Sequence, residues 1–212
     1  MKVVVASMNP DKLGELNELL GLPGIELVSL RDFPGAVAPE EVGATLADNA
    51  RIKARAAARF TRLPAIADDT GLEVDALGGR PGVHAARYAG SGASYASNVA
   101  LLLAELSGVP PALRGARFRT VCVACLPDGR EVAGEGALEG RITEAPRGES
   151  GFGYDPVFEL DARELPEGHA AGPPRTLAEI SAAEKNALSH RARAVRKLKP
   201  ALQELLGLPP SG

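Results

Sequence analysis

One segment near the N-terminus has the residue types that bind phosphate groups. Asn9 can cap a helix that begins at Pro10, with Asp11 in its first turn, and Lys12 adds a positive charge. A helix N-terminus presents free backbone N–H groups and a partial positive charge, which together favour an anion. The segment therefore predicts a phosphate cradle, and the alternative is a capped helix with a solvated lysine.

A second segment combines two acidic residues with a polar helix face. Glu40 and Glu41 precede a predicted helix in which Asn49 and Lys53 are four residues apart, a spacing that puts both side chains on one face. Acidic residues before a helix are ordinary partners of the helix dipole, so a purely structural role is the alternative. Because the rest of this helix is rich in alanine, its polar stripe can face a ligand.

Asp68 and Asp69 follow a short apolar strand predicted over residues 63–67. Ligands of α/β proteins bind at strand ends, and paired buried carboxylates are costly unless cations or a metal accompany them. Because side chains alternate along a strand, no more than one of the two need face the site. Hard oxygen ligands without His or Cys nearby favour Mg²⁺ or Mn²⁺ over zinc. The alternative is a simple acidic turn.

The fourth segment, residues 150–156, places Phe152 between two glycines. Glycines allow a ring and the backbone to approach a planar ligand closely, and the ring can stack on a base. Asp155 and the downstream pair His190 and Arg191 can supply hydrogen-bond donors and acceptors to the edge of that base. A glycine-rich turn with aromatic core anchors is the alternative. Together the four segments match a metal-dependent enzyme that acts on a nucleoside triphosphate.

Composition excludes several classes of protein. The 212 residues are 45% hydrophobic and 24% charged, which is ordinary for a globular chain, and no apolar run approaches the roughly 18 residues of a membrane span. The net charge of −3 does not favour non-specific nucleic-acid binding. Two cysteines exclude a disulfide scaffold and make the reducing cytoplasm the expected compartment. Cys122 and Cys125 are expected on opposite faces of a strand, buried in the core and without a metal.

The elements that must position these segments alternate early in the chain between strands and helices. Strands are predicted over residues 2–7, 25–30, 63–67, 117–126, 131–138 and 154–160, with extended structure also over 72–77. Helices are predicted from Asn9 to Gly21, over residues 44–60 and 94–106, and again from Thr176, with Pro200 as a kink or break. This order predicts an α/β fold with a mixed sheet.

At these residues the sequence resembles the inosine triphosphate pyrophosphatase family, also called XTP/dITP diphosphatases or non-canonical purine NTP pyrophosphatases. The resemblance runs from Val3 to about Arg193. It rests on residues 4–9 with Lys12; 40–45 with 48–50 and 53–54; 67–72; 79–82 with 86–88; 151–156; and 184–186 with 189–191. One departure is Ser7-Met8-Asn9, where the family usually has Thr-Gly-Asn.

The resemblance implies Mg²⁺-dependent hydrolysis of ITP, dITP and XTP to the monophosphate and pyrophosphate, with Mn²⁺ as an alternative ion. It implies an elongated two-lobed α/β fold with a central mixed β-sheet flanked by helices. Residues 1–212 would form a single domain with the active-site cleft between its lobes. The protein would be a cytoplasmic homodimer that removes deaminated purines from the nucleotide pool, without nucleic-acid or membrane partners.

The same resemblance assigns roles to individual residues. Asp69 is the catalytic acid–base and a metal ligand, and Glu41 with Glu40 assists the metal. The phosphates would be held by Ser7, Met8, Asn9, Pro10, Asp11, Lys12, Lys53 and Lys185. Thr70 would contact the substrate, and the base would be read by Phe152, Gly153, Tyr154, Asp155, His190 and Arg191. Two other functions remain open: a related pyrophosphatase for modified pyrimidine nucleotides, and a non-catalytic nucleotide-binding module.

Overall fold

The computed structural model describes residues 1–165 and 173–209, and the chain divides into two compact units. Unit 1 comprises Met1–Asp69, Thr120–Gly136 and Arg191–Gly212, and unit 2 comprises Thr70–Arg119 and Ala137–His190. The boundaries fall within β3, β5 and β6 and at the start of α5, so these elements contribute residues to both units. The cleft expected between two lobes stays a prediction.

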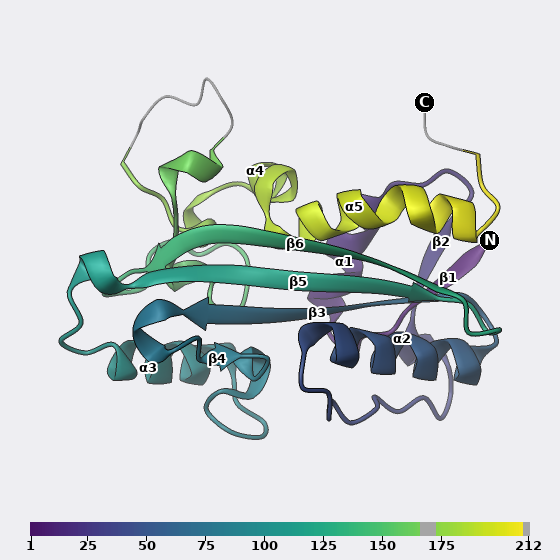
Figure 1. The fold of residues 1–212 in the computed structure, drawn as a ribbon, viewed down its shortest axis with the longest axis horizontal. Helices are drawn as coiled ribbons and strands as arrows, with labels where there is room; N and C mark the ends of the chain where they lie inside the picture. Colours follow the sequence, from purple (N-terminus) through teal and green to yellow (C-terminus); the bar gives the residue numbers. More distant parts are fainter. Residues whose placement is uncertain (166–172, 210–212) are drawn as a thin grey trace. The chain divides into compact units, whose positions relative to one another are not determined.

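A mixed sheet with flanking helices forms the framework (Figure 1). The helices are α1 (Pro10–Leu20), α2 (Leu46–Thr61), α3 (Tyr95–Glu105), α4 (Ala182–Leu188) and α5 (His190–Leu205). The strands are β1 (Lys2–Val5), β2 (Glu26–Ser29), β3 (Ala65–Val74), β4 (Pro81–Gly82), β5 (Gly115–Cys125), β6 (Glu131–Ile142) and β7 (Phe158–Leu160). Their order is β2-β1-β3-β5-β6-β7, with β4 paired to β3.

Parallel and antiparallel pairs both occur in this sheet. Strand β1 runs parallel to β2 and β3, whereas β4 is antiparallel to β3 and β7 is antiparallel to β6. The predicted α/β class with a mixed sheet is therefore confirmed. No helix in the described residues is long and apolar enough to span a bilayer.

In unit 1 the sheet is buried on both faces, because side chains alternate along each strand and helices pack against each face. Val3 and Val5 pack with Leu16 of α1 and Leu198 of α5 on one face, and Val4 packs with the alanines of α2 on the other. Figure 1 shows α2 and α5 on opposite sides of these strands. The small alanine side chains let α2 lie close to the sheet, and this brings its polar residues near β3.

The two cysteines confirm the predicted alternation. Cys122 packs in the cluster with α1 and α5, and Cys125 packs in the cluster with α2, so the thiols lie on opposite faces. Both are free and buried. Gly134 of β6 has a packing role, since a Cβ there would collide with the carbonyl oxygen of Ala194 in α5.

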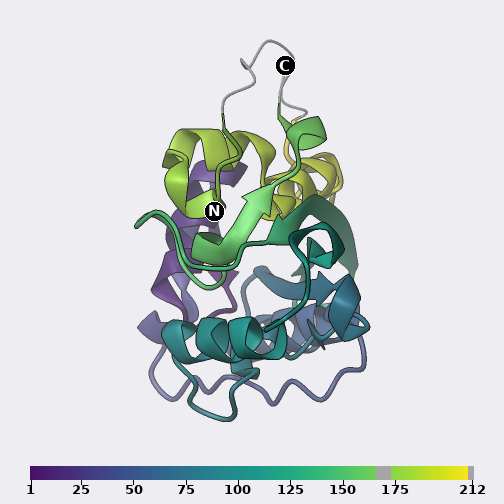
Figure 2. The same cartoon turned by 90° about the vertical axis from the view of Figure 1, so that its left-hand side faces the viewer.

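Unit 2 has its own core, in which aromatic rings are concentrated. Phe118 of β5 and Phe158 of β7 have ring centroids 4.6 Å apart, and Leu102 and Leu106 from the α3 region belong to the same buried cluster. Figure 2 shows α3 and α4 on opposite sides of β7. Buried Tyr154 is a member of this core, so the core anchors the segment of residues 150–156.

Strand β3 corrects the prediction for residues 63–77. A strand end at Ala67 and a turn at Asp68 were expected, but β3 continues from Ala65 to Val74 without a break. Its neighbour β5 supplies backbone hydrogen-bond partners along the sheet, so polar residues can occupy the strand interior when cations compensate their charge. The two aspartates therefore lie within a strand, not after one.

Two smaller predictions also need correction. Pro200 does not end α5, which continues to Leu205, because Leu198 and Leu202 on either side of it are fully buried in the core. Residues 154–160 are not one strand: Asp155–Val157 form a single helical turn, and β7 follows it. The proline in that turn has a fixed φ that suits the first helical positions.

Candidate functional site

The alternation of β3 sends its two neighbouring aspartates to opposite faces of the sheet in unit 1. Asp68 points toward α1 and α5, where it meets Lys12 and Arg191, and Asp69 points toward α2, where it meets Lys53. Strand β1 ends at Val5, opposite Ile66 of β3, so it does not extend alongside the aspartates. The side-chain alternation expected for the two aspartates is present, and which of them faces a substrate stays a prediction.

On the α2 face, an ammonium group joins two carboxylates. Lys53 Nζ lies 2.6 Å from Asp69 Oδ1 and 2.9 Å from Glu41 Oε1. Asn49 Nδ2 donates to Asp69 Oδ2 at 3.4 Å. Glu40 is exposed, whereas Glu41 is half-buried and reaches Lys53. Of the two acidic residues before the helix, Glu41 is therefore the one that joins this group.

In this group the surroundings raise the pKa of the Asp69 carboxyl group and keep Lys53 positively charged. Burial raises the pKa of Asp69, and Glu41 adds to the rise, while Lys53 opposes it without cancelling it. Burial alone would lower the pKa of Lys53, but Asp69, Asp68 and Glu41 outweigh burial and raise it. Lys53 therefore stays protonated at neutral pH, and Asp69 accepts a proton more readily than an exposed aspartate does.

On the opposite face, Asp68 is the centre of a buried ion-pair network. Its Oδ2 lies 3.1 Å from Lys12 Nζ and accepts from Arg191 Nε at 3.1 Å and Nη2 at 3.0 Å. Arg191 also pairs with Glu15 of α1. Burial would raise the pKa of Asp68, but Lys12 and Arg191 dominate and hold it well below the usual range. Asp68 is thus a structural anion that orients two cations.

The turn before α1 keeps the geometry that its sequence suggested. Asn9 N–H donates to Ser7 Oγ at 3.1 Å, and α1 begins at Pro10. Met8 has ordinary negative φ and is partly exposed, so replacing the usual glycine introduces no backbone strain. The side chains of Pro10 and Asp11 lie outside the described part of the structure.

In unit 2, Asp155 holds an aromatic ring and a lysine together. Its Oδ2 accepts from the Phe152 N–H at 2.9 Å and from Lys185 Nζ at 2.9 Å. The Lys185 ammonium lies over the Phe152 ring, 4.5 Å from its centroid, a cation–π distance. The expected contact of Lys185 with the phosphates stays a prediction. The ring of Tyr95 lies 5.9 Å from that of Phe152.

The other residues of unit 2 that were expected to read the base make different contacts. Tyr154 directs its hydroxyl into the core, where it donates to the Ala85 carbonyl at 2.8 Å. His190 is buried and stacks on Phe118 with centroids 4.6 Å apart. Gly153 has a φ of +66°, the left-handed region that glycine tolerates, and it completes the turn after Phe152.

The predicted residues therefore fall into two groups, one in each unit. Unit 1 contains Ser7, Met8, Asn9, Pro10, Asp11, Lys12, Glu40, Glu41, Lys53, Asp69 and Arg191, and unit 2 contains Thr70, Phe152, Gly153, Tyr154, Asp155, Lys185 and His190. Their assignment to substrate and metal stays a prediction. The guanidinium of Arg191, expected to read the base, is bonded to Asp68 and Glu15.

Two residues near these groups were not anticipated. Glu15 pairs with Arg191, and its position one turn after Lys12 on α1 is a signal that could have suggested a shared face. Tyr95, 45% exposed at the start of α3, lies beside Phe152, and no local pattern in the sequence links them. Contacts of this kind depend on packing between segments distant in the chain.

The carboxylates of Glu41 and Asp69 are the residues that would hold a divalent cation. No set of three or more His, Cys, Asp or Glu side chains among the described residues is grouped as metal ligands. Mg²⁺ commonly uses one or two carboxylates and completes its shell with substrate phosphates and water. Two oxygen donors that share one ammonium neighbour fit that requirement.

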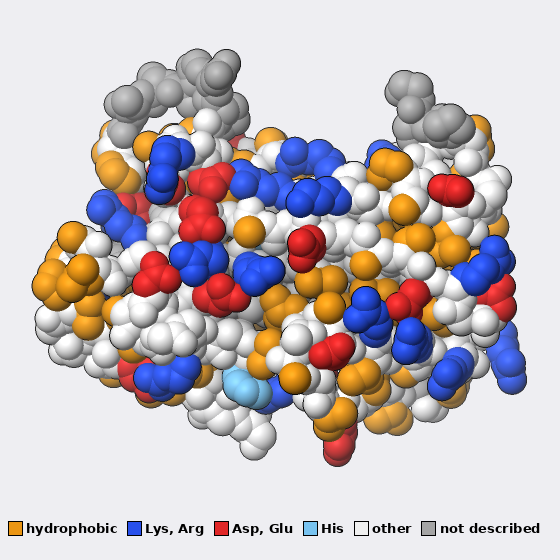
Figure 3. Space-filling view, viewed as in Figure 1, with side chains coloured by type: hydrophobic (Ala, Val, Ile, Leu, Met, Phe, Trp, Pro, Cys, Tyr) orange, Lys and Arg blue, Asp and Glu red, His pale blue; other side chains and the backbone are white. Residues whose placement is uncertain are grey.

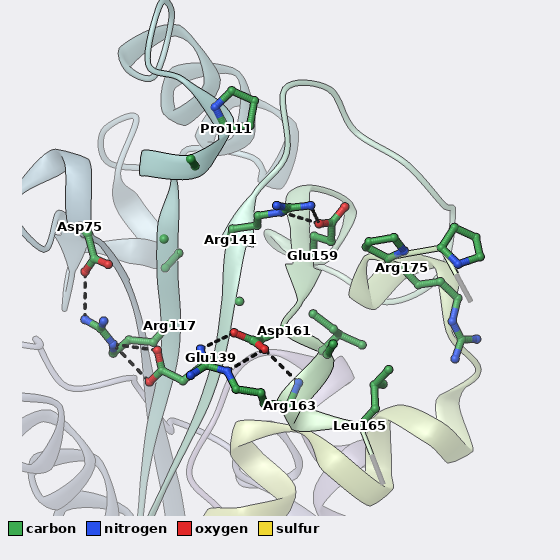
Figure 4. A pocket seen from close by; sticks show the side chains of 18 residues that line it. Asp75, Pro111, Arg117, Glu139, Arg141, Glu159, Asp161, Arg163, Leu165 and Arg175 are labelled. Atoms are coloured by element: carbon green, nitrogen blue, oxygen red, sulfur yellow. Dashed lines mark hydrogen bonds and ion pairs between the residues drawn. The ribbon is translucent and has the colours of Figure 1, made fainter. Parts of the chain in front are cut away.

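A cavity of about 710 Å³ lies elsewhere in unit 2, and none of the predicted site residues in the described chain lines it (Figure 4). Its charged side chains pair with one another: Arg117 with Asp75 and Glu139, and Arg141 with Glu159. Figure 3 shows the same mixture of acidic and basic side chains over this part of β5 and β6. With its charges mutually compensated, this cavity offers no field that would attract a polyanion.

Comparison with known proteins gives consistent matches over nearly the whole chain. The model of the Ham1 family matches residues 3–201. The dITP/XTP pyrophosphatase of Geobacillus kaustophilus is 47% identical over 206 residues, which cover 97% of this chain and 96% of the relative. A HAM1 protein from Coxiella burnetii has a TM-score of 0.82 and 38% identity, covering 96% of this chain and 99% of its own. A nucleoside-triphosphatase/dITP/XTP pyrophosphatase structure from Mycobacterium abscessus has a TM-score of 0.69 and 46% identity, covering 98% and 100%.

Proposed function

Because the chain belongs to the Ham1 family, we propose that it hydrolyses non-canonical purine nucleoside triphosphates to the monophosphate and pyrophosphate. The observation that carries this proposal is the Lys53 ammonium between Asp69 and Glu41, with the pKa of Asp69 raised by burial. A basic carboxylate beside a fixed cation can take a proton from water while the cation stabilises charge on a phosphate.

In the proposed reaction, unit 1 acts on the triphosphate. A water oxygen bonds to the α-phosphorus, the bond from that phosphorus to the oxygen bridging to the β-phosphate breaks, and the water proton passes to an Asp69 oxygen. Lys12 and Lys53 stabilise the departing pyrophosphate, and the N-terminus of α1 adds its partial positive charge. Mg²⁺ held by Glu41 and Asp69 would neutralise charge on the phosphates.

Unit 2 is proposed to recognise the base. The Phe152 ring stacks on the purine, Asp155 and Lys185 fix that ring, and a donor such as a backbone N–H of residues 150–156 bonds the 6-oxo group of hypoxanthine or xanthine. Adenine has an amino donor at that position and would set one donor against another, a mismatch that a site built with a hydrogen-bond donor penalises strongly. Exchanging Phe152 for Ala should raise KM for dITP about tenfold, because base stacking contributes roughly 1–3 kcal/mol.

The decisive experiment measures pyrophosphate release from dITP, ITP, XTP, ATP, GTP and a modified pyrimidine triphosphate, with and without magnesium. Fast release from the deaminated purines, dependent on magnesium and lost in D69N, supports the proposal. Equal rates on ATP and ITP would refute the assignment of base recognition. Binding without release would indicate a nucleotide-binding module, and a preference for the pyrimidine would indicate the related class of pyrophosphatase.

We also propose a cytoplasmic homodimer as the working form of the protein, an inference that comes from the family resemblance alone. Light scattering coupled to gel filtration gives the mass in solution and tests the dimer directly, since one chain has a mass of 21.9 kDa. A mass equal to one chain across the working concentration range would refute this part of the proposal.

A further inference from the structure

Asn49 has contacts that set it apart from the other residues of α2. Its side chain is fully buried, its Oδ1 accepts the Gly43 N–H at 2.8 Å, and its Nδ2 donates to Asp69 Oδ2 at 3.4 Å. The reverse orientation of the amide would place an NH₂ against an N–H and an oxygen against a carboxylate, so the neighbours determine it. Asparagine is the residue type that can serve both contacts.

Asn49 and Lys53 both form hydrogen bonds to strand β3, at Asp69, and to the loop before α2. Lys53 bonds Asp69 Oδ1 and Glu41, and Asn49 contacts Asp69 Oδ2 and Gly43, which is two residues after Glu41. The two side chains are one helical turn apart on α2. Each oxygen of Asp69 therefore has its own partner on the helix, and each partner also holds the loop that carries Glu41.

The backbone of Gly43 lies close to the Asn49 side chain, as this arrangement requires. A Cβ at this position would lie 2.6 Å from Asn49 Oδ1 and 2.6 Å from the Asp48 Cβ. Gly43 is not among the glycines with positive φ, so the requirement comes from the limited space beside Asn49 and Asp48 and not from backbone conformation. The loop can donate its N–H to Asn49 because no side chain intervenes.

We propose that Asn49 is a positioning residue that fixes the orientation of the Asp69 carboxylate relative to Glu41 during triphosphate hydrolysis. This proposal rests on the proposed function, since it assigns Asn49 to that reaction. Without the Nδ2 donor, the carboxylate is held at one oxygen only and turns toward Lys53. Loss of a partner that orients a ligand or catalytic group commonly costs about 10- to 100-fold in activity, and the effect belongs in kcat because the proposal gives Asn49 a contact with Asp69 and none with substrate.

Two variants separate the contacts of Asn49. N49D keeps an acceptor for the Gly43 N–H but presents no donor to Asp69, and N49A removes both contacts. We expect kcat for dITP to fall at least tenfold in both variants, with KM changed less than twofold. G43A leaves the Asn49 side chain chemically intact but displaces it, so it should lower kcat similarly.

Asn98 provides a matched control in unit 2. It is also a buried asparagine on a helix, and it accepts the Ala89 N–H at 2.8 Å and donates to the Ala86 carbonyl at 3.1 Å. N98A loses the same number of hydrogen bonds but none to a predicted site residue. We expect it to lower the melting temperature about as much as N49A while leaving kcat per folded molecule unchanged.

The outcomes distinguish this proposal from the function on which it rests. If the wild-type protein releases no pyrophosphate from any triphosphate of the panel, the proposed function fails and the role of Asn49 fails with it. If the wild type is active and N49D retains its kcat, only the role of Asn49 is overturned. Equal losses of kcat per folded molecule in N49A and N98A would likewise overturn it, because the effect would then not depend on the contact with Asp69.

Discussion

The neighbouring residues Asp68 and Asp69 should respond differently to the same substitution. D68N removes the charge that Lys12 and Arg191 surround, with the Asp68 side chain 0% and the Arg191 side chain 3% exposed. D69N removes a carboxylate whose ionised form burial already disfavours, since its pKa is raised in the folded protein. We expect D68N mainly to destabilise the fold, and D69N to abolish turnover with a smaller loss of stability, because Lys53 keeps Glu41 as a partner.

The magnitude for D68N follows from the buried ion pair. Removing one partner of such a pair typically costs about 3–5 kcal/mol, because the remaining charge stays buried without compensation. The residual pairing of Arg191 with Glu15 favours the lower end of that range. A loss of about 3 kcal/mol corresponds to a fall in Tm of roughly 6–12 °C for a chain of this size. For D69N the loss should be smaller, because Lys53 keeps its pair with Glu41 and burial of the Asp69 charge is relieved.

The direction of the pKa shift of Asp68 determines how the stability difference between wild type and D68N changes with pH. The pKa of Asp68 is lowered on folding, so its stabilisation is present above the unfolded value of about 3.9 and disappears as the pH falls toward the folded value. The stability difference between wild type and D68N should therefore be largest near neutral pH and shrink below about pH 4. Urea unfolding followed by circular dichroism, at several pH values, measures this difference.

Two results would refute this reasoning. A D68N variant as stable as the wild type at pH 7 would show that the ion-pair network does not stabilise the fold. A D69N variant that loses as much stability as D68N would show that burial does not dominate the energetics of Asp69. Pyrophosphate release, measured in parallel, must fall by several orders of magnitude in D69N, and near-normal turnover would remove Asp69 from the mechanism.

Three further outcomes are expected. Replacing Gly134 by Ala should cost about 1–3 kcal/mol in urea unfolding, because the new methyl group meets the carbonyl oxygen of Ala194. Cys122 and Cys125 should resist a chromogenic thiol reagent until the protein unfolds, since burial raises the pKa of both thiols; rapid native labelling would contradict this. The kcat/KM profile should fall on the acid side with a midpoint above 3.8, the unperturbed value for Asp69, because ionised Asp69 is the proposed base.

Local patterns in the sequence were sufficient for much of the fold and for the residue types of the site. The capped start of α1 at Pro10 and the hairpin of β5 and β6 follow from turn and capping residues and from hydrophobic periodicity. Strand alternation also predicted that the two cysteines point to opposite faces. The four-residue spacing of Asn49 and Lys53 predicted a shared face, and both reach Asp69.

The sequence by itself determined which segments carry charge and in what order, because helix caps, turns and strand alternation depend on neighbouring residues. Tertiary structure alone decided the partner of each charge. It continued β3 through Asp68 and Asp69, paired Asp68 with a cation from α5, and placed Lys185 against Phe152. Such pairings join residues far apart in the chain, and their energies depend on burial and distance, which no local pattern encodes.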